Sequence, residues 1–145
     1  MAAVDHRAVR QLLRQVLFGS ADPDIPRPED GHVEFENYKF TPPNPPQPFL
    51  RETYLITSEI NTAYDQVEAI GEVHYDVFDV LGRGTERAAD IARAVSEAFP
   101  PGNSLRDSGV TINIVRTYQA PGRATKAWYF IPVVVQWRTF ATISA

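Results

Sequence analysis

The segment "GEVHYDVFDVLGRGTERAADIARAVSEAFPPG", residues 71–102, places a strand pattern and a helix pattern on either side of one short turn. In the strand, predicted over 69–81, Val73, Tyr75 and Val77 alternate with polar residues at the two-residue period of β structure. After the turn, apolar residues recur at helical spacing and form one stripe, Ala88, Ile91, Ala92, Val95, Ala98 and Phe99. Two prolines and a glycine then end the helix. The small alanines predict a helix that lies close against a sheet.

Further strand patterns lie on both sides of this segment. Upstream are a short strand within "HVEFENY" and a longer one in "FLRETYLITSEI", and downstream are "GVTINIVRTYQA" and "KAWYFIPVVVQWRTFAT". Because only "PGRAT" separates the last two runs, we expect them to form an antiparallel hairpin. The polar residues of 58–70 predict a protruding hairpin tip. A further amphipathic helix is predicted over 5–18, with Asp5 as N-cap and Gly19 as stop.

Length and composition favour one domain spanning residues 1–145. The chain has a net charge of −4, 43% hydrophobic residues and no cysteine. A single core suits this length, and the missing cysteines exclude disulfides and thiolate metal sites. The acidic balance argues against a protein whose main task is to grip nucleic acid. Charges interrupt every apolar run near the N-terminus, so we expect neither a signal peptide nor a membrane span.

Two proline-containing segments are predicted to be irregular. Residues 20–31 combine three prolines with four acids and predict a loop. Within "NYKFTPPNPPQPFLRETYL", residues 37–55, five prolines fall between positions 42 and 48. Proline removes a hydrogen-bond donor and favours extended geometry, so this stretch suits neither a helix nor a central strand. We expect an extended arm over 41–48 that crosses a surface, either of its own subunit or of a neighbour.

The last strand pattern is apolar on both faces. Tyr129, Ile131, Val133, Val135 and Trp137 point one way, while the other face includes Phe130, Val134 and Phe140. Pro132 cannot donate to a ladder, which predicts that the strand is at a sheet edge or bulged there. An apolar edge needs a cover, and an assembled partner would provide one. The elements together predict an α+β fold: a mostly antiparallel sheet of about five strands with both helices on one face.

No catalytic or metal-binding pattern stands out. The three histidines are scattered without ligand spacing, and no serine lies in a nucleophile-elbow pattern. Asp76 and Asp79 are three residues apart on one strand, so they face opposite sides and suit solvated or capping positions better than a catalytic pair. We therefore predict no enzyme activity, no cofactor and no metal.

Two weaker features each allow two interpretations. The turn Gly82–Thr85 precedes a helix in the layout of a phosphate-binding loop. However, Arg87 occupies the position where the dinucleotide motif requires a small residue, so a tight strand-to-helix turn is favoured. Basic residues gather near the last hairpin, Arg116, Arg123, Lys126 and Arg138. They either face an acidic partner or are scattered surface charge.

Several motifs in this order resemble the small phage tail-terminator proteins of siphophages and prophages. The quoted stretches are "FTPP" at 40–43 and "PFLR" at 48–51, the strand over 71–79, the glycines at 82 and 84, "FPPG" at 99–102, and "PVVVQWR" at 132–138. The resemblance covers nearly the whole chain. The acidic loop and the extra prolines depart from the family pattern.

The resemblance implies a structural virion protein. Such proteins form a ring, with six copies as the expected number, at the head-proximal end of the tail. There they stop polymerisation of the tail tube and join the head-completion or stopper protein. DNA passes through the lumen without sequence recognition. The protein is made in the bacterial cytoplasm and needs no membrane. The alternatives are another head–tail connector, a stopper or baseplate-proximal adaptor, and a small nucleotide-binding domain that uses Gly82–Thr85.

For this role the candidate interface residues form three groups. The first is the arm, represented by Tyr38, Phe40 and Phe49. The second is the outward side of the last strand, with Phe130, Val134 and Phe140. The third is a set of arginines, Arg51, Arg116 and Arg138. Each of them could equally serve ordinary packing or carry solvated charge.

Overall fold

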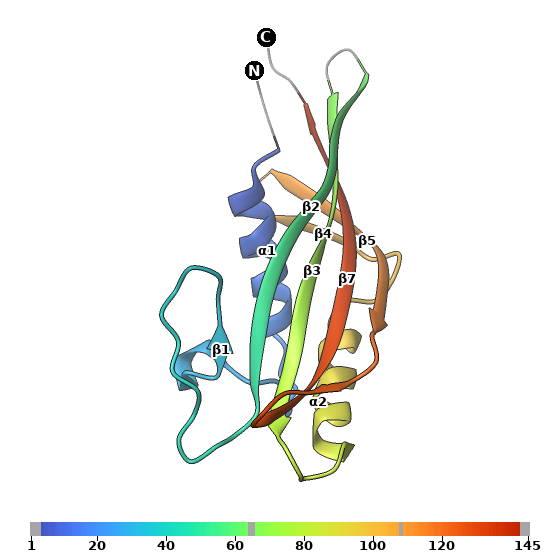
Figure 1. Cartoon of the computed structure of the whole chain (residues 1–145). Helices are drawn as coiled ribbons and strands as arrows, with labels where there is room; N and C mark the ends of the chain where they lie inside the picture. Colours follow the sequence, from blue (N-terminus) through green and yellow to red (C-terminus); the bar gives the residue numbers. More distant parts are fainter. Residues whose placement is uncertain (1–3, 64–65, 108, 143–145) are drawn as a thin grey trace.

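Figure 1 shows the computed structural model, which describes residues 4–63, 66–107 and 109–142. Its helices are α1 (His6–Phe18), the short 3-10 helix η1 (Pro28–Asp30) and α2 (Glu86–Glu97). Its strands are β1 (Val33–Glu34), β2 (Phe49–Ala63), β3 (Gln66–Val80), β4 (Ser104–Asp107), β5 (Val110–Gln119), β6 (Arg123–Ala124) and β7 (Trp128–Thr142). The helix predicted over 5–18 is confirmed, with the Asp5 side chain accepting from the Ala8 amide.

The strands form one curled, mixed sheet in the order β1-β2-β3-β7-β5-β4, with β6 paired to β7. The predicted α+β class is confirmed. The expected five antiparallel strands are only roughly matched, because the described residues form seven strands and β1 pairs with β2 in parallel. The sequence missed β4 and β6, which have four and two residues and therefore too few positions to show an alternating pattern.

The parallel pair explains why a stiff segment precedes β2. Val33 lies opposite Leu50 and Glu34 opposite Arg51, so the chain must leave β1 and return in the same direction before β2 starts. Parallel neighbours need a crossover of about a dozen residues or more, and residues 35–48 provide it. The crossover is not one straight arm, because it bends at Asn44 and Pro45. In Figure 1 it forms the large loops beside β2.

The hairpin of β2 and β3 is longer than the sequence predicted. Both strands have 15 residues, and the ladder continues from Phe49 opposite Phe78 as far as Ala63 opposite Gln66. A strand of that length spans roughly 50 Å, and in Figure 1 the hairpin extends, together with β7, beyond β4 and β5. Pairing therefore extends through most of the predicted tip, 58–70. Residues 64 and 65 lie outside the described residues.

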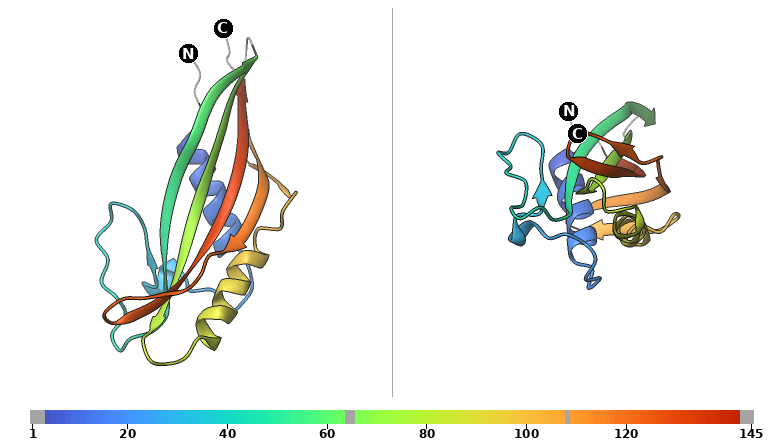
Figure 2. Two further views of the ribbon diagram at one scale, coloured as in Figure 1. Left: turned by 45° about the vertical axis from the view of Figure 1, so that its right-hand side comes forward. Right: turned by 60° about the horizontal axis from the view of Figure 1, so that its bottom comes forward.

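One face of the sheet, the inner face, packs against both helices, as the views in Figure 2 show. Its central residues are almost fully buried and come from neighbouring strands, namely Val73, Tyr75, Val77, Val133, Val135 and Trp137. Helix α1 contributes four buried residues, and α2 adds its alanine-rich stripe. The sheet curls around this core, so that α1 contacts β4 and β5 as well as β2 residues. Within the described residues no helix is long and apolar enough to cross a bilayer.

A buried polar network ties α1 to the sheet. Arg14 of α1 donates to both oxygens of Glu52, at 3.0 and 3.1 Å from its Nε and 2.6 Å from a terminal nitrogen. The Tyr75 hydroxyl also donates to Glu52, at 3.0 Å. Burial raises the pKa of Tyr75 well above its ordinary value, and the adjacent Glu52 carboxylate adds to this. The Glu52 carboxylate is thus buried but fully paired.

Gly71 is required by a close approach between strands. A Cβ atom at this position would lie 2.4 Å from the Trp137 ring and 2.3 Å from the Leu55 carbonyl oxygen. Its partner across the ladder is Trp137 itself. The ring crosses over the glycine and stacks on Tyr54, with centroids 5.4 Å apart. A side chain at residue 71 would displace the largest group of the core.

Of the two expectations for the strand that contains Pro132, an edge position or a bulge, the structure corrects the first for the strand as a whole, and no bulge interrupts its pairing with β3. Strand β7 lies between β3 and β5, and its register with β3 is continuous through Asp76 opposite Pro132. The Pro132 carbonyl accepts from the Ala120 amide at 2.9 Å, on the β5 side. Pairing with β5 ends one residue away at Val133, and pairing with β6 begins at Phe130. The missing donor of Pro132 therefore falls in the gap between β5 and β6.

Candidate assembly surface

The outer face, on the opposite side of the sheet from the helices, is covered only at one end. There five aromatic rings from the arm, β2, β3 and β7 pack together. We call this group the aromatic cluster, and its members are Phe40, Phe49, Phe78, Trp128 and Phe130. Phe49 is its centre, with centroid distances of 4.7 Å to Phe78, 4.9 Å to Trp128 and 5.0 Å to Phe40. Phe78 also stacks on Phe130 at 4.9 Å. The arm thus contributes Phe40 to packing on its own subunit.

A shallow cavity of about 400 Å³ lies beside the aromatic cluster. Arg51 lines it, with its guanidinium 4.6 Å above the Phe78 ring and its Nε hydrogen-bonded to Glu34 of β1. The Arg51 side chain is 47% exposed. Its charge is therefore available at the surface, although one side of it is already held by the ring and the carboxylate.

The middle of the outer face carries a polar group. Glu72 accepts from Gln136 at 3.0 Å and lies 3.1 Å from Nε2 of His74. The hydrogen bond with His74 lowers the pKa of Glu72, and the bond with Gln136 adds to this. In contrast, burial raises the pKa of Asp76, although His74 and Arg51 partly oppose this effect. Asp76 is the poorly solvated carboxylate of this face.

From its middle toward the tip of the β2–β3 hairpin, the outer face is exposed and partly apolar. Its exposed apolar side chains are Leu55, which lies opposite Glu72, and, closer to the tip, Ile60 and Phe140; we call these three the distal patch. Ile60 and Phe140 flank Glu68 across the ladder, and the Arg138 guanidinium lies 5.6 Å from the Phe140 ring centre. Large apolar side chains gathered on one side of a sheet are typical of interaction surfaces.

The structure separates the nine predicted interface residues into exposed and buried ones. Tyr38 is 74% exposed and Phe140 is 45% exposed. Arg116, above the Tyr118 ring at 4.4 Å, and Arg138 are also exposed, while Phe40 and Phe130 are partly buried. Phe49 and Val134, at 2% and 4%, are buried within the subunit and offer no surface to a neighbour. The sequence did not indicate Leu55 or Ile60. Alternation from Phe49 places Leu55 on the outer face, but Ile60 reaches that face only because a register shift between Ile56 and Ser58 reverses the alternation.

The turn over Gly82–Thr85 is flanked by an ion pair in which only the carboxylate is buried. Asp79 is only 1% exposed, and Arg87 of α2 donates to both its oxygens, at 2.6 and 3.0 Å. The pair with Asp79 raises the pKa of Arg87. Asp79 is therefore not a solvated position as expected, although it and Asp76 do face opposite sides. The Arg87 side chain, which breaks the dinucleotide motif, joins the start of α2 to the end of β3.

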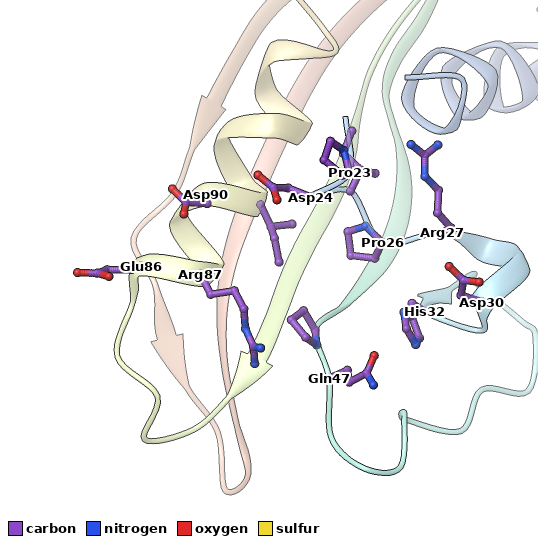
Figure 3. Close-up of a pocket in the computed structure, with 13 residues that line it drawn as sticks. Pro23, Asp24, Pro26, Arg27, Asp30, His32, Gln47, Glu86, Arg87 and Asp90 are labelled. Carbon is purple, nitrogen blue, oxygen red and sulfur yellow. The ribbon is translucent and has the colours of Figure 1, made fainter. Parts of the chain in front are cut away.

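A groove of about 510 Å³ lies on the helix side of the molecule (Figure 3). It is bounded by the start of α2, by residues 23–27 and by the end of the arm. Four acidic residues line it, Asp24, Asp30, Glu86 and Asp90, over apolar residues that include Ile25, Pro26, Pro48 and Ile91. Figure 3 shows Glu86 and Asp90 projecting from α2 on the side away from His32 and Gln47, while Asp24 lies beside α2. We call this the acidic groove.

Both arginines that line the acidic groove are already engaged. Arg27 donates to the backbone carbonyls of Phe18, Ser20 and Asp22, and Arg87 binds Asp79. Within the described part of the chain, no ion pair neutralises Asp24, Asp30 or Glu86, while Asp90 contacts Arg93 at 3.5 Å. Among the described residues, no group of three or more metal-ligating side chains could hold a metal ion.

Comparison with known proteins gives one family. A family model described as phage tail terminator protein matches residues 6–137. No curated protein sequence matches the chain. A solved structure of a protein without a functional name aligns with a TM-score of 0.71 and 17% sequence identity, covering 94% of this chain and 96% of its own. The structural likeness shows that the two chains share a fold.

Proposed function

The chain belongs to the phage tail terminator family, and we propose that it acts as the terminator itself, in a ring at the head-proximal end of the tail. The family is structural rather than catalytic and places the protein among virion components. In the proposed role the ring stops addition of tail tube protein and offers its other side to the head-completion or stopper protein. Six copies are the expected number.

The observation that carries this proposal is the match over residues 6–137, which includes the arm, most of the sheet and both helices. The uncovered distal patch supports it, because exposed apolar side chains on a sheet favour contact with another protein. A head-to-tail contact between different surfaces of identical subunits closes into a ring when its rotation allows. We propose that such contacts use the members of the predicted interface that are exposed or only partly buried, namely Tyr38, Phe40, Arg51, Arg116, Phe130, Arg138 and Phe140.

In the proposed ring, DNA passes through the lumen without sequence recognition. A net charge of −4 supports this part of the proposal. Binding to the phosphate backbone depends on neutralisation by basic side chains. A protein with more acidic than basic residues therefore favours transit of DNA over retention.

The test is an assembly assay with purified tail tubes. The protein is added to polymerising tube protein, and the ends and lengths of the tubes are examined by electron microscopy. We expect closed rings at one tube end and a narrow length distribution, with longer tubes when the protein is omitted. Tubes that elongate unchanged would refute the terminator role. Binding to isolated heads or baseplates without binding to tube ends would instead assign a connector, stopper or adaptor role.

A further inference from the structure

The charges of this chain are divided unevenly along its length. Residues 110–145 contain four basic and no acidic residues, whereas residues 1–109 contain ten basic against eighteen acidic ones. The first part therefore carries a formal charge of −8 and the second a charge of +4. If the fold keeps these two parts of the chain apart, one subunit carries both a basic surface and an acidic surface.

Two of the four basic residues have aromatic neighbours in their own subunit, and two are unengaged. Arg116 lies over Tyr118 and Arg138 over Phe140. Arg123 and Lys126 are exposed, and in the described part of the chain neither side chain has an ion pair or ring contact. They belong to residues 120–127, which connect β5 to β7 and include β6. We call this segment the basic loop.

The basic loop and the acidic groove lie at the same end of the molecule but on different sides. In the left view of Figure 2, the connection into β7 extends to the lower left, whereas α2 is at the lower right. The groove is bounded by α2, on the helix side. A head-to-tail ring interface requires two different, separate surfaces on one subunit. The placement of these two surfaces meets that requirement.

We propose that the basic loop of one copy docks into the acidic groove of the next copy. This inference rests on the proposed ring and adds one specific pair of contacting surfaces to its subunit junction. The groove has acidic side chains at its rim and apolar residues such as Ile25 and Ile91 beneath them. Arginine and lysine combine an aliphatic stem with a charged head, which fits such a lining. At about 510 Å³ the groove lies within the usual size of ligand pockets.

The experiment reverses the charge of each surface separately. The loop variant carries Arg123→Glu and Lys126→Glu, and the groove variant carries Glu86→Lys and Asp90→Lys. Either variant alone brings like charges together at every subunit junction, and we expect its self-association to weaken by about tenfold or more. Sedimentation velocity at low and high salt measures this, since screening should reduce the difference between variant and wild type.

Mixing the two variants gives the decisive result. In an alternating ring each reversed loop meets a reversed groove, and each unreversed loop meets an unreversed groove. An equimolar mixture should therefore assemble when neither variant does so alone. Carbodiimide treatment of the wild-type assembly, prepared from light and isotopically heavy copies, should also join Lys126 of one copy to Glu86 or Asp90 of another.

Controls separate this inference from the proposed function. Arg7→Glu with Arg106→Glu changes the net charge by the same amount outside both surfaces, and it should assemble like the wild type. Thermal unfolding of each monomer identifies variants that have lost their fold. If wild-type rings form and both reversals still assemble, the docking inference is wrong while the ring stands. If the wild type forms no ring, alone or on tail tubes, both proposals are wrong.

Discussion

Both faces of the central sheet carry apolar residues, but the outer face also carries a polar middle, and the two faces differ in what covers them. On the inner face, Val73, Tyr75 and Trp137 are at most 1% exposed beneath α1 and α2. On the outer face, Phe49 and Phe78 are buried only where the arm and the β5–β7 connection reach, and Ile60 and Phe140 remain exposed farther along. The inner face is thus completed by its own chain, whereas the outer face is completed over one end alone.

This difference follows from the length and path of the crossover. Residues 35–48 must connect the parallel strands β1 and β2, so they stay near the end of the sheet where these strands pair. Phe40 can therefore reach Phe49 but not the distal patch. The uncovered part of the outer face is where we place contacts with other proteins.

The largest effect should come from removing the centre of the inner face. We expect Trp137→Ala to cost about 3–5 kcal/mol in the free energy of unfolding, because it leaves a cavity and removes the stack on Tyr54. Phe140→Ala, on the other face of the same strand, should cost less than about 1 kcal/mol. Urea unfolding of both variants gives the comparison. Equal losses would show that the outer face is as well packed as the inner one.

A smaller loss should follow from disrupting the covered end of the outer face. Phe49→Ala removes contacts with three rings, and we expect it to cost about 2–4 kcal/mol. The arm should also loosen, so trypsin should cut after Lys39 faster than in the wild type. Tyr38→Ala is the matched control, because this exposed side chain should change stability by less than about 0.5 kcal/mol. An unchanged cleavage rate in the Phe49 variant would mean that the contacts between aromatic side chains, such as Phe40 with Phe49, do not hold the arm against the sheet.

The smallest effect concerns the carboxylate in the middle of the outer face. Because burial raises the pKa of Asp76, the folded protein binds a proton more readily than the unfolded chain, and this group lowers stability as pH rises through its titration range. Asp76→Asn should therefore stabilise the protein at pH 7, by roughly 1 kcal/mol or less. The gain should vanish below the ordinary pKa of aspartate, about 3.9. Thermal unfolding from pH 3 to 7 tests the sign, and destabilisation by Asn at pH 7 would contradict it.

Local patterns identified many elements but not their neighbours. The helix start at Asp5 and the hairpin of β5 and β7 were predicted, because capping and a short connection are local signals. The role of the prolines as a parallel crossover was not, since parallel pairing joins segments that no short motif connects. Likewise, the ion pair of Asp79 with Arg87 depends on how α2 folds back on β3.

For the candidate assembly surface, too, the sequence indicated some of the residues but not how the fold arranges them. The sequence indicated that the last strand has two apolar faces, and it placed Phe140 among the interface residues. It could not show that Phe49 and Val134 are buried within the subunit while Leu55 and Ile60 are exposed. The basic group near the last hairpin was visible in the sequence, but the acidic groove combines residues from three separate segments.

By itself the sequence determined the alternation of each strand, the caps of α1, the proline-rich break before β2 and the separation of acidic from basic residues. These depend on side-chain chemistry and on neighbours a few residues apart. The tertiary structure decided which face of the sheet the helices cover and how far the arm reaches. The reason is that burial depends on segments that are distant in the chain. The two-residue period of a strand divides its residues between two faces, but it does not determine which face is exposed to solvent.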